Sequence, residues 1–115
     1  MAKLVSRIVV GIISWEGKHE SAKRIAENIK DAADELIIIY SNKAEKKETG
    51  PGIWIQCPNI DYFGRKFNTL LSHILPECTL LLIQADAISS DWPKLIRRYR
   101  HVMRERPDVG LWSPN

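Results

Sequence analysis

Polar and aromatic side chains follow three aliphatic runs of this sequence, at the points where the runs end. The runs span residues 5–13, 35–40 and 79–83. The side chains at or just after their ends are Ser14, Trp15, Tyr40, Ser41 and Asp86. In an open α/β sheet the carboxyl ends of parallel strands share one edge, where ligands bind. We therefore expect these residues to converge on one site.

This mixture of side chains suits a nucleotide. The ring of Trp15 can stack on a base, and hydroxyl groups can bind the ribose. The carboxylate of Asp86 can hold a divalent cation, which in turn holds phosphates. The same residue types are also common in loops and helix caps, so an ordinary structural role for them stays open.

A basic residue stands at the start of a predicted helix in the segment 59–68. Arg65 follows Gly64 and falls in the first turn of that helix. Its guanidinium can reach back over the loops and pair with a phosphate through two hydrogen bonds. Helix N-termini also favour anions. The alternative for Arg65 is a solvated side chain at a helix start.

Aliphatic runs alternate along the chain with segments of helical periodicity. Predicted strands cover residues 5–13, 35–40, 53–56, 79–83 and 109–112. Predicted helices cover residues 19–31 and 62–75, and a third, capped by Ser90 or Asp91, runs to about residue 105. The order β-α-β-β-α-β-α-β predicts a three-layer α/β/α fold with a largely parallel sheet. We expect a single domain over residues 1–115 that is incomplete at its C-terminus, because the chain stops straight after a strand.

Composition sets broad limits on function. The 115 residues include 17 basic and 14 acidic side chains, a net charge of +3 that is too small to indicate nucleic acid by itself. Cys57 and Cys78 lack the spacing of a metal site, and we expect two buried free thiols in a reducing compartment. No apolar run approaches the ~20 residues of a membrane span. We therefore expect a cytoplasmic, soluble protein.

The motifs, in their order and spacing, resemble the N-terminal, donor-binding half of a GT-A-fold glycosyltransferase of the inverting family-two type. The turn after the first strand is Ser14-Trp15-Glu16, and the second strand ends in Tyr40-Ser41-Asn42. Residues 59–68 are similar to the family's Asn-x-Gly-x-x-x-Ala-x-Asn segment, and Gln84-Ala85-Asp86 stands in place of its Asp-x-Asp motif. The resemblance covers nearly the whole chain.

The resemblance implies a nucleotide-sugar-binding domain that takes part in metal-assisted transfer of a sugar from a nucleoside diphosphate. It also implies a Mg²⁺ or Mn²⁺ ion on Asp86, which would neutralise the leaving diphosphate. The residues that it places around the nucleotide sugar are Ser14, Trp15, Tyr40, Ser41, Arg65, Ala85 and Asp86.

Three positions depart from the family pattern, and one of them is Asp61, which stands where the family has Gly. Gln84 replaces the first acid of the metal motif, and Tyr40 stands where the family has a nucleotide-binding Asp. The family's general base lies in the acceptor-binding half, and His19 is the one histidine of this chain near the exit of the first strand. We therefore expect binding of a nucleotide sugar without turnover. A non-catalytic α/β interaction module is the alternative.

The last predicted helix is rich in basic residues. These are Lys94, Arg97, Arg98, Arg100, His101, Arg104 and Arg106. Such a face can contact nucleic acid or an anionic membrane surface, or can simply be solvated because apolar residues occupy the core positions. We expect no nucleic-acid partner and keep peripheral membrane contact open. The unfinished sheet also predicts a homo-oligomer, because an uncovered sheet edge invites pairing.

Overall fold

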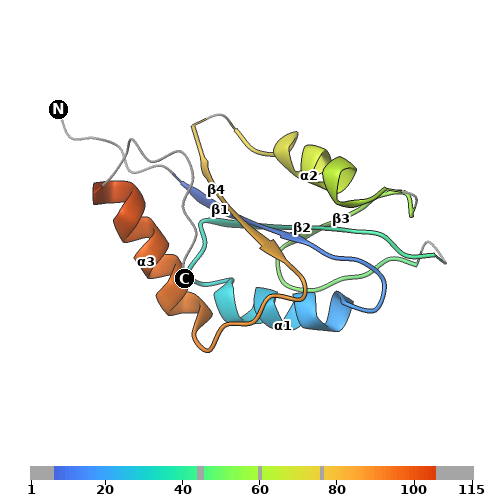
Figure 1. Cartoon of the computed structure of the whole chain (residues 1–115), viewed down its shortest axis with the longest axis horizontal. Helices are drawn as coiled ribbons and strands as arrows, with labels where there is room; N and C mark the ends of the chain where they lie inside the picture. Colours follow the sequence, from blue (N-terminus) through green and yellow to red (C-terminus); the bar gives the residue numbers. More distant parts are fainter. Residues whose placement is uncertain (1–6, 44–45, 60, 76, 106–115) are drawn as a thin grey trace.

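The computed structural model describes residues 7–43, 46–59, 61–75 and 77–105, in which strands and helices alternate (Figure 1). The strands are β1 (Ile8–Ile13), β2 (Glu35–Tyr40), β3 (Ile53–Gln56) and β4 (Thr79–Gln84). The helices are α1 (His19–Ile29), α2 (Phe63–Leu71) and α3 (Trp92–Glu105). None of these helices is long and apolar enough to span a membrane.

The strands form one parallel sheet in the order β3-β2-β1-β4. From β1 the chain first adds β2 and β3 on one side, and then returns to the other side of β1 to add β4. The direction of winding therefore reverses between β1 and β4. Because β1 is paired on both sides and covered on both faces, all six of its residues are buried.

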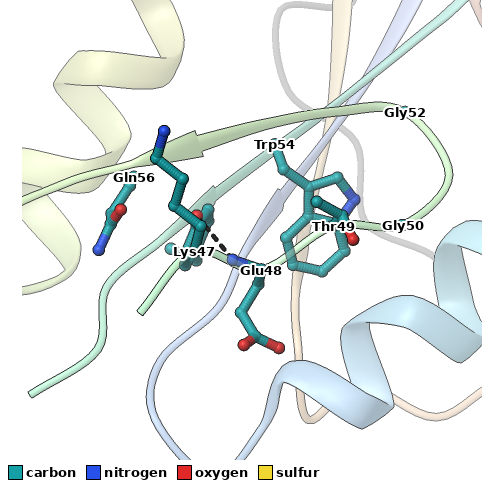
Figure 2. Close-up of a pocket in the computed structure, with 8 residues that line it drawn as sticks. Lys47, Glu48, Thr49, Gly50, Gly52, Trp54 and Gln56 are labelled. Carbon is teal, nitrogen blue, oxygen red and sulfur yellow. Dashed lines mark hydrogen bonds between the residues drawn. The ribbon is translucent and has the colours of Figure 1, made fainter. Parts of the chain in front are cut away.

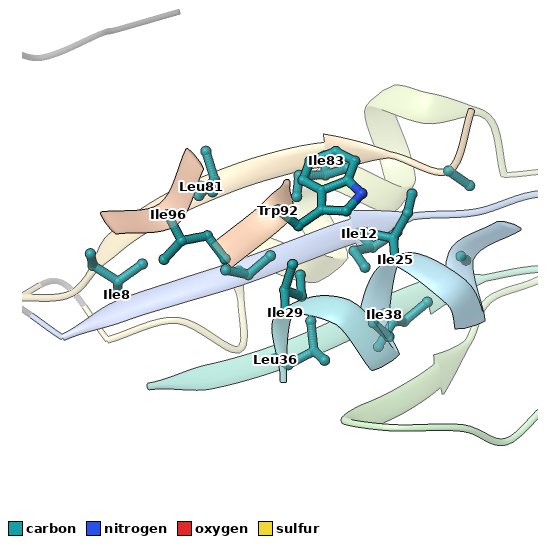
Figure 3. Close-up of a cluster of buried hydrophobic side chains, with 14 of the residues drawn as sticks. Ile8, Ile12, Ile25, Ile29, Leu36, Ile38, Leu81, Ile83, Trp92 and Ile96 are labelled. Carbon is teal, nitrogen blue, oxygen red and sulfur yellow. The ribbon is translucent and has the colours of Figure 1, made fainter. Parts of the chain in front are cut away.

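Alternate side chains of the strands feed two separate cores. Ile8, Val10 and Ile12 of β1 pack with α1 and α3 on one face of the sheet, the core drawn in Figure 3. Val9 packs with Leu70 of α2 on the other face. This alternation follows from the strand period of two. Figure 1 shows the resulting three layers, with α2 on one side and α1 and α3 on the other.

Two local features fix the helices against the sheet. A Cβ atom on Gly11 would lie 2.4 Å from Leu70 Cδ2, so glycine is what lets α2 approach β1 closely. At the start of α3, the Asp91 carboxylate accepts a hydrogen bond of 3.0 Å from the Lys94 backbone N–H. This side-chain cap satisfies one of the N–H groups that a helix start leaves unpaired.

The structure confirms the predicted fold class, a three-layer α/β/α domain with a parallel sheet. The strands 35–40 and 53–56 have the predicted bounds, and the capping by Asp91 is confirmed. The helix predicted over 62–75 is shorter in the structure, because α2 ends at Leu71. Beyond that point, His73 N bonds to Leu70 O and Ile74 N to Leu71 O, the three-residue spacing of turns and not the four-residue spacing of an α-helix. The predicted strand 109–112 lies outside the described residues.

The connection from β2 to β3 contains no helix within its described part. Glu48 anchors this segment, because its carboxylate is 3.0 Å from Lys23 Nζ of α1 and its backbone N–H donates to the Tyr40 hydroxyl at 2.9 Å. The hydrogen bond from Lys23 lowers the pKa of Glu48. Residues 46–49 are therefore mostly exposed, but Glu48 ties them to α1 and β2. Cys57 and Cys78 are both free thiols, as predicted; Cys57 is buried, but Cys78 is only partly buried.

Candidate functional site

A cleft of about 510 Å³ lies at the carboxyl edge of the sheet, and we call it the edge cleft. It spans the point where the winding reverses, because its walls include the exit of β1 and the last residue of β4. The first residues of α2 and the loop before it also line the cleft. The lining residues are Ile13, Trp15, Glu16, Ser41, Lys43, Asn59, Asp61, Tyr62, Phe63, Lys66 and Gln84.

A buried lysine contributes the most unusual group of this cleft. Lys66 is only 4% exposed, and its ammonium donates a hydrogen bond of 3.1 Å to the Ser14 carbonyl. Burial lowers the pKa of Lys66, while the nearby Cys57 and Asp61 act in the opposite direction. An ammonium has three N–H donors, and the structure shows one of them bonded to a neutral carbonyl. The electrostatics of this position therefore favour an anion in the cleft.

A buried hydrogen-bond network joins the ends of β1 and β2 behind the cleft. Its centre is His19, the first residue of α1. The ring Nδ1 lies 2.6 Å from Ser14 Oγ, and the ring Nε2 lies 2.6 Å from Asn42 Oδ1 and 3.2 Å from the Ser41 carbonyl. All four residues of the network are buried. The network therefore fixes the relative positions of the two strand exits.

The partners of the network assign its protons. The Asn42 side-chain NH₂ donates to the Lys46 carbonyl at 2.7 Å, which turns Oδ1 of the same amide toward His19. Since Nε2 faces two oxygen acceptors, it carries a proton, and a neutral ring then accepts at Nδ1 from the Ser14 hydroxyl. Ser14 is fully buried, so this Ser-His-Asn arrangement does not present a nucleophile to a substrate. With both ring nitrogens bonded, His19 is also poorly placed to act as the general base considered from the sequence.

Asp86 lies at the same edge of the sheet, next to β1. The backbone N–H of Ala85 donates to the Ile13 carbonyl at 3.0 Å, which extends the pairing of β4 with β1 by one residue. Ala85 is fully buried in the core and its backbone N–H is already bonded to Ile13, so it presents no surface to a ligand. Asp86 and Gln84 are exposed. Of these three residues, Gln84 lines the edge cleft.

Tyr40 lies at a second cleft, which we call the β3 cleft. This cleft has a volume of about 360 Å³ and lies between the segment before β3 and the strand itself (Figure 2). Tyr40 is buried, its hydroxyl accepts from Glu48 N–H, and its ring meets those of His19 and Trp54 edge-on. Tyr40 therefore faces α1, whereas the next residue, Ser41, lines the edge cleft.

The remaining predicted residues occupy different surroundings. Trp15 is half-buried, lines the edge cleft and packs against the core below it. Ser14 lies behind the cleft, bonded to His19. Arg65 points to solvent, with 75% of its side chain exposed and its guanidinium 3.7 Å from the Asp61 carboxylate. The structure thus brings Trp15, Ser41 and the neighbourhood of Asp86 to one edge, with Arg65 outside the cleft lining.

Lys66, His19 and Asn42 were not selected from the sequence as binding residues. A signal for two of them was present in the helical periodicity. Lys66 lies four residues before the buried Leu70, so it falls on the core-facing side of α2. His19 lies three residues before the buried Ala22 on α1. A polar residue on the buried side of an amphipathic helix indicates a built-in polar contact.

Comparison with known proteins gives a likeness of fold alone. No protein-family model and no curated protein matches the chain. Two crystal structures of Rv0371c from Mycobacterium tuberculosis H37Rv are similar, one of them a complex with manganese. At 14% identity the manganese complex has a TM-score of 0.56 over 84% of this chain and 59% of that one. The other has a TM-score of 0.57 at 14% identity, over 87% and 62% of the two chains.

The chain spans about three fifths of the length of these solved structures. Its described residues contain no group of three or more His, Cys, Asp or Glu side chains that could hold a metal ion. A cation at this sheet edge would therefore need oxygen ligands beyond the protein carboxylates, such as those of a phosphate.

Proposed function

We propose that this chain is a nucleotide-sugar-binding domain of the GT-A, family-two-like type, which holds a nucleoside diphosphate sugar in the edge cleft. The observation that carries the proposal is the buried Lys66 at a cleft on the point where the sheet's winding reverses. Ligands of open α/β sheets bind at such points, outside the carboxyl ends of the strands. The volume of about 510 Å³ falls within the range of ligand pockets, roughly 300–1,000 Å³.

The chemistry of the cleft walls supports a ligand with a phosphate and a ring. Lys66 and Lys43 supply positive charge for a diphosphate. Trp15, Tyr62 and Phe63 supply aromatic surface on which a base can stack. The cleft thus has separate groups for the anionic and the planar parts of a nucleotide.

A divalent cation fits this site only together with the ligand. Asp86 offers one carboxylate, and Gln84 offers a neutral amide oxygen in place of a second acid. Mg²⁺ is commonly bound through one or two carboxylates together with substrate phosphates and water. The manganese complex of the similar Rv0371c structure is in keeping with a metal at this fold. We therefore infer that Mg²⁺ or Mn²⁺ joins the site when a nucleoside diphosphate is bound.

The proposal is for binding without turnover by this chain. Sugar transfer to a hydroxyl needs a base that removes the acceptor proton. Both ring nitrogens of His19 are already hydrogen-bonded behind the cleft. Metal-assisted glycosyl transfer is therefore proposed for this domain together with an acceptor-binding part that supplies the base.

A thermal-shift panel tests the proposal. The melting temperature is measured with UDP, GDP, CDP and ADP, each with and without Mn²⁺ or Mg²⁺. A ligand at 100 times its dissociation constant adds about 2.7 kcal/mol of stability, which is a rise of about 10 °C or more for a domain of this size. We expect one diphosphate to give this rise only with metal. A metal-independent rise, or none with any diphosphate, would contradict the proposal.

Three variants sharpen the panel. Asp86→Ala should abolish the metal-dependent rise, whereas Asp31→Ala, an exposed acid between α1 and β2, should leave it intact. Lys66→Met should weaken diphosphate binding at least ten-fold, because a charge-assisted hydrogen bond contributes about 1.5–3 kcal/mol. In the wild type, affinity should fall as the pH rises through the lowered pKa of Lys66, below 10.5. That alkaline loss should be absent in Lys66→Met.

The alternative, a non-catalytic interaction module, has its own observation. Phe63 and Leu71, at the two ends of α2, and Leu75, four residues beyond it, are 43%, 43% and 62% exposed. Exposed apolar side chains that form a continuous patch often mark protein contacts. The alternative, including the predicted homo-oligomer, expects no diphosphate-dependent rise and a concentration-dependent sedimentation coefficient. Leu71→Ser should then return the chain to a monomer.

A further inference from the structure

The outward face of α3 carries positive charge almost without interruption. Trp92, Ile96 and Tyr99 take the buried side of the helix. The exposed residues opposite them are Lys94, Arg97, Arg98, His101 and Arg104. We call this set the basic face. Its four lysine and arginine charges exceed the net charge of +3 of the whole chain.

The outward face of the neighbouring helix α1 carries both acidic and basic residues. On α1, Glu20 lies 3.7 Å from Lys23, and Glu27 lies 2.7 Å from Lys30. Acids and bases thus alternate and neutralise one another along α1. On the described helix α3, the one acidic residue is Glu105, at its last position. Either charge pattern keeps a helix face solvated, so solvation does not explain why nearly all the charged residues of α3 are basic.

An exposed aliphatic side chain stands just before this helix. Ile88, in the loop from β4 to α3, is 95% exposed. Aliphatic side chains beside a basic helix face can enter the boundary between headgroups and acyl chains of a bilayer. The phosphate backbone of a nucleic acid offers no comparable apolar phase, and the basic face contains no aromatic residue on which a base could stack.

We propose that the basic face of α3, together with Ile88, docks reversibly on membrane surfaces that contain anionic lipid. This inference is independent of the nucleotide-binding proposal, since none of its residues lines the edge cleft. A lysine or arginine near an anionic surface strengthens binding about five-fold. Lys94, Arg97 and Arg104 alone supply three such charges, which give a weak, salt-sensitive association that Ile88 reinforces.

Vesicle co-sedimentation tests the proposal with the full chain. The vesicles contain phosphatidylcholine alone or with about one third phosphatidylserine, at low and at physiological salt. We expect binding to the phosphatidylserine vesicles only, and weaker binding as salt increases. Equal binding to neutral vesicles, or no binding to anionic vesicles at low salt, would overturn the proposal.

Matched variants locate the surface. Arg97→Gln with Arg104→Gln should weaken vesicle binding about 25-fold, and Ile88→Ser should weaken it about three- to ten-fold. Arg24→Gln with Lys18→Gln removes the same charge from the region of α1 and should have a much smaller effect. Equal losses in both pairs would show that net charge alone attracts the chain and would overturn the assignment to α3. Tighter binding to a DNA or RNA duplex than to the vesicles, unaffected by Ile88→Ser, would assign the face to nucleic acid instead.

Discussion

Removal of the His19 ring should destabilise the chain more than any other single histidine change. In His19→Ala, the Ser14 hydroxyl and the Asn42 side-chain oxygen each lose their 2.6 Å partner. Ser14 is fully buried and Asn42 is 6% exposed, so water reaches neither group freely. A buried polar group left without a partner costs about 1–3 kcal/mol. The two together predict a loss of about 2–6 kcal/mol, against a typical total of about 5–15 kcal/mol.

Urea unfolding followed by far-ultraviolet circular dichroism measures this loss. His73→Ala is the matched control, because His73 is exposed on the turn after α2 and its ring Nδ1 bonds only to nearby groups of that segment among the described contacts. Exposed substitutions of this kind change stability by about 0.5 kcal/mol or less. A His19→Ala loss as small as that of His73→Ala would refute the reasoning.

A double-mutant cycle with Ser14→Ala separates the network from the cavity that the missing ring leaves. If the two residues act through their hydrogen bond, the double variant should lose about 0.5–3 kcal/mol less than the sum of the single variants. The reason is that Ser14→Ala removes the very hydroxyl that His19→Ala leaves unpaired. Additive losses would show that His19 acts through packing alone.

Two further predictions concern the fold around the site. Gly11→Ala should lower the free energy of unfolding in urea by about 1–3 kcal/mol, because the new Cβ would meet Leu70 at 2.4 Å. The control Gly64→Ala, whose Cβ meets nothing within 4 Å, should be neutral or stabilising, and equal losses in both variants would count against the steric explanation. The hydrogen bond from the Ile8 backbone N–H lowers the pKa of Asp34, with neighbouring arginines adding to the effect. The charged Asp34 carboxylate stabilises the fold above its unfolded pKa of about 3.8, and this stabilisation is lost as the pH falls through the lowered pKa of the folded state. Asp34→Asn should therefore lower the free energy of unfolding by about 1 kcal/mol at neutral pH after solvent screening, and by almost nothing near pH 2. A pH-independent difference would contradict the linkage.

Much of the architecture was predictable because it depends on local periodicity. Continuous β-branched runs mark strands that are buried on both faces, as at residues 35–40. The shorter run 53–56 also became a strand with its predicted bounds, although none of its residues is buried. The third helix begins where its cap was predicted, because the Asp91 carboxylate bonds to a backbone N–H only three residues along the chain, a local contact. The end of α2 was less predictable, because the apolar stripe continues past Leu71 while the backbone tightens into turns.

The site itself was only partly predictable, because the direction of a side chain depends on the phase of its element. Successive residues of a strand point to opposite faces, which places Tyr40 against α1 and Ser41 at the edge cleft. Successive residues of a helix point about 100° apart. The sequence offered Arg65 as the phosphate-binding cation, but Arg65 is solvated, and its neighbour Lys66 is the buried one.

By itself, then, the sequence determined an α/β domain with a parallel sheet and a set of polar residues at strand exits, because hydrophobic periodicity is a local property of the chain. The tertiary structure decided which of those residues share a cleft. Lys66 and Ser14, like His19 and Asn42, are far apart along the chain, and only the packing of α1 and α2 against the ends of β1 and β2 brings them within hydrogen-bond distance. Long-range contacts of this kind leave no trace in local periodicity beyond a polar residue on a buried face.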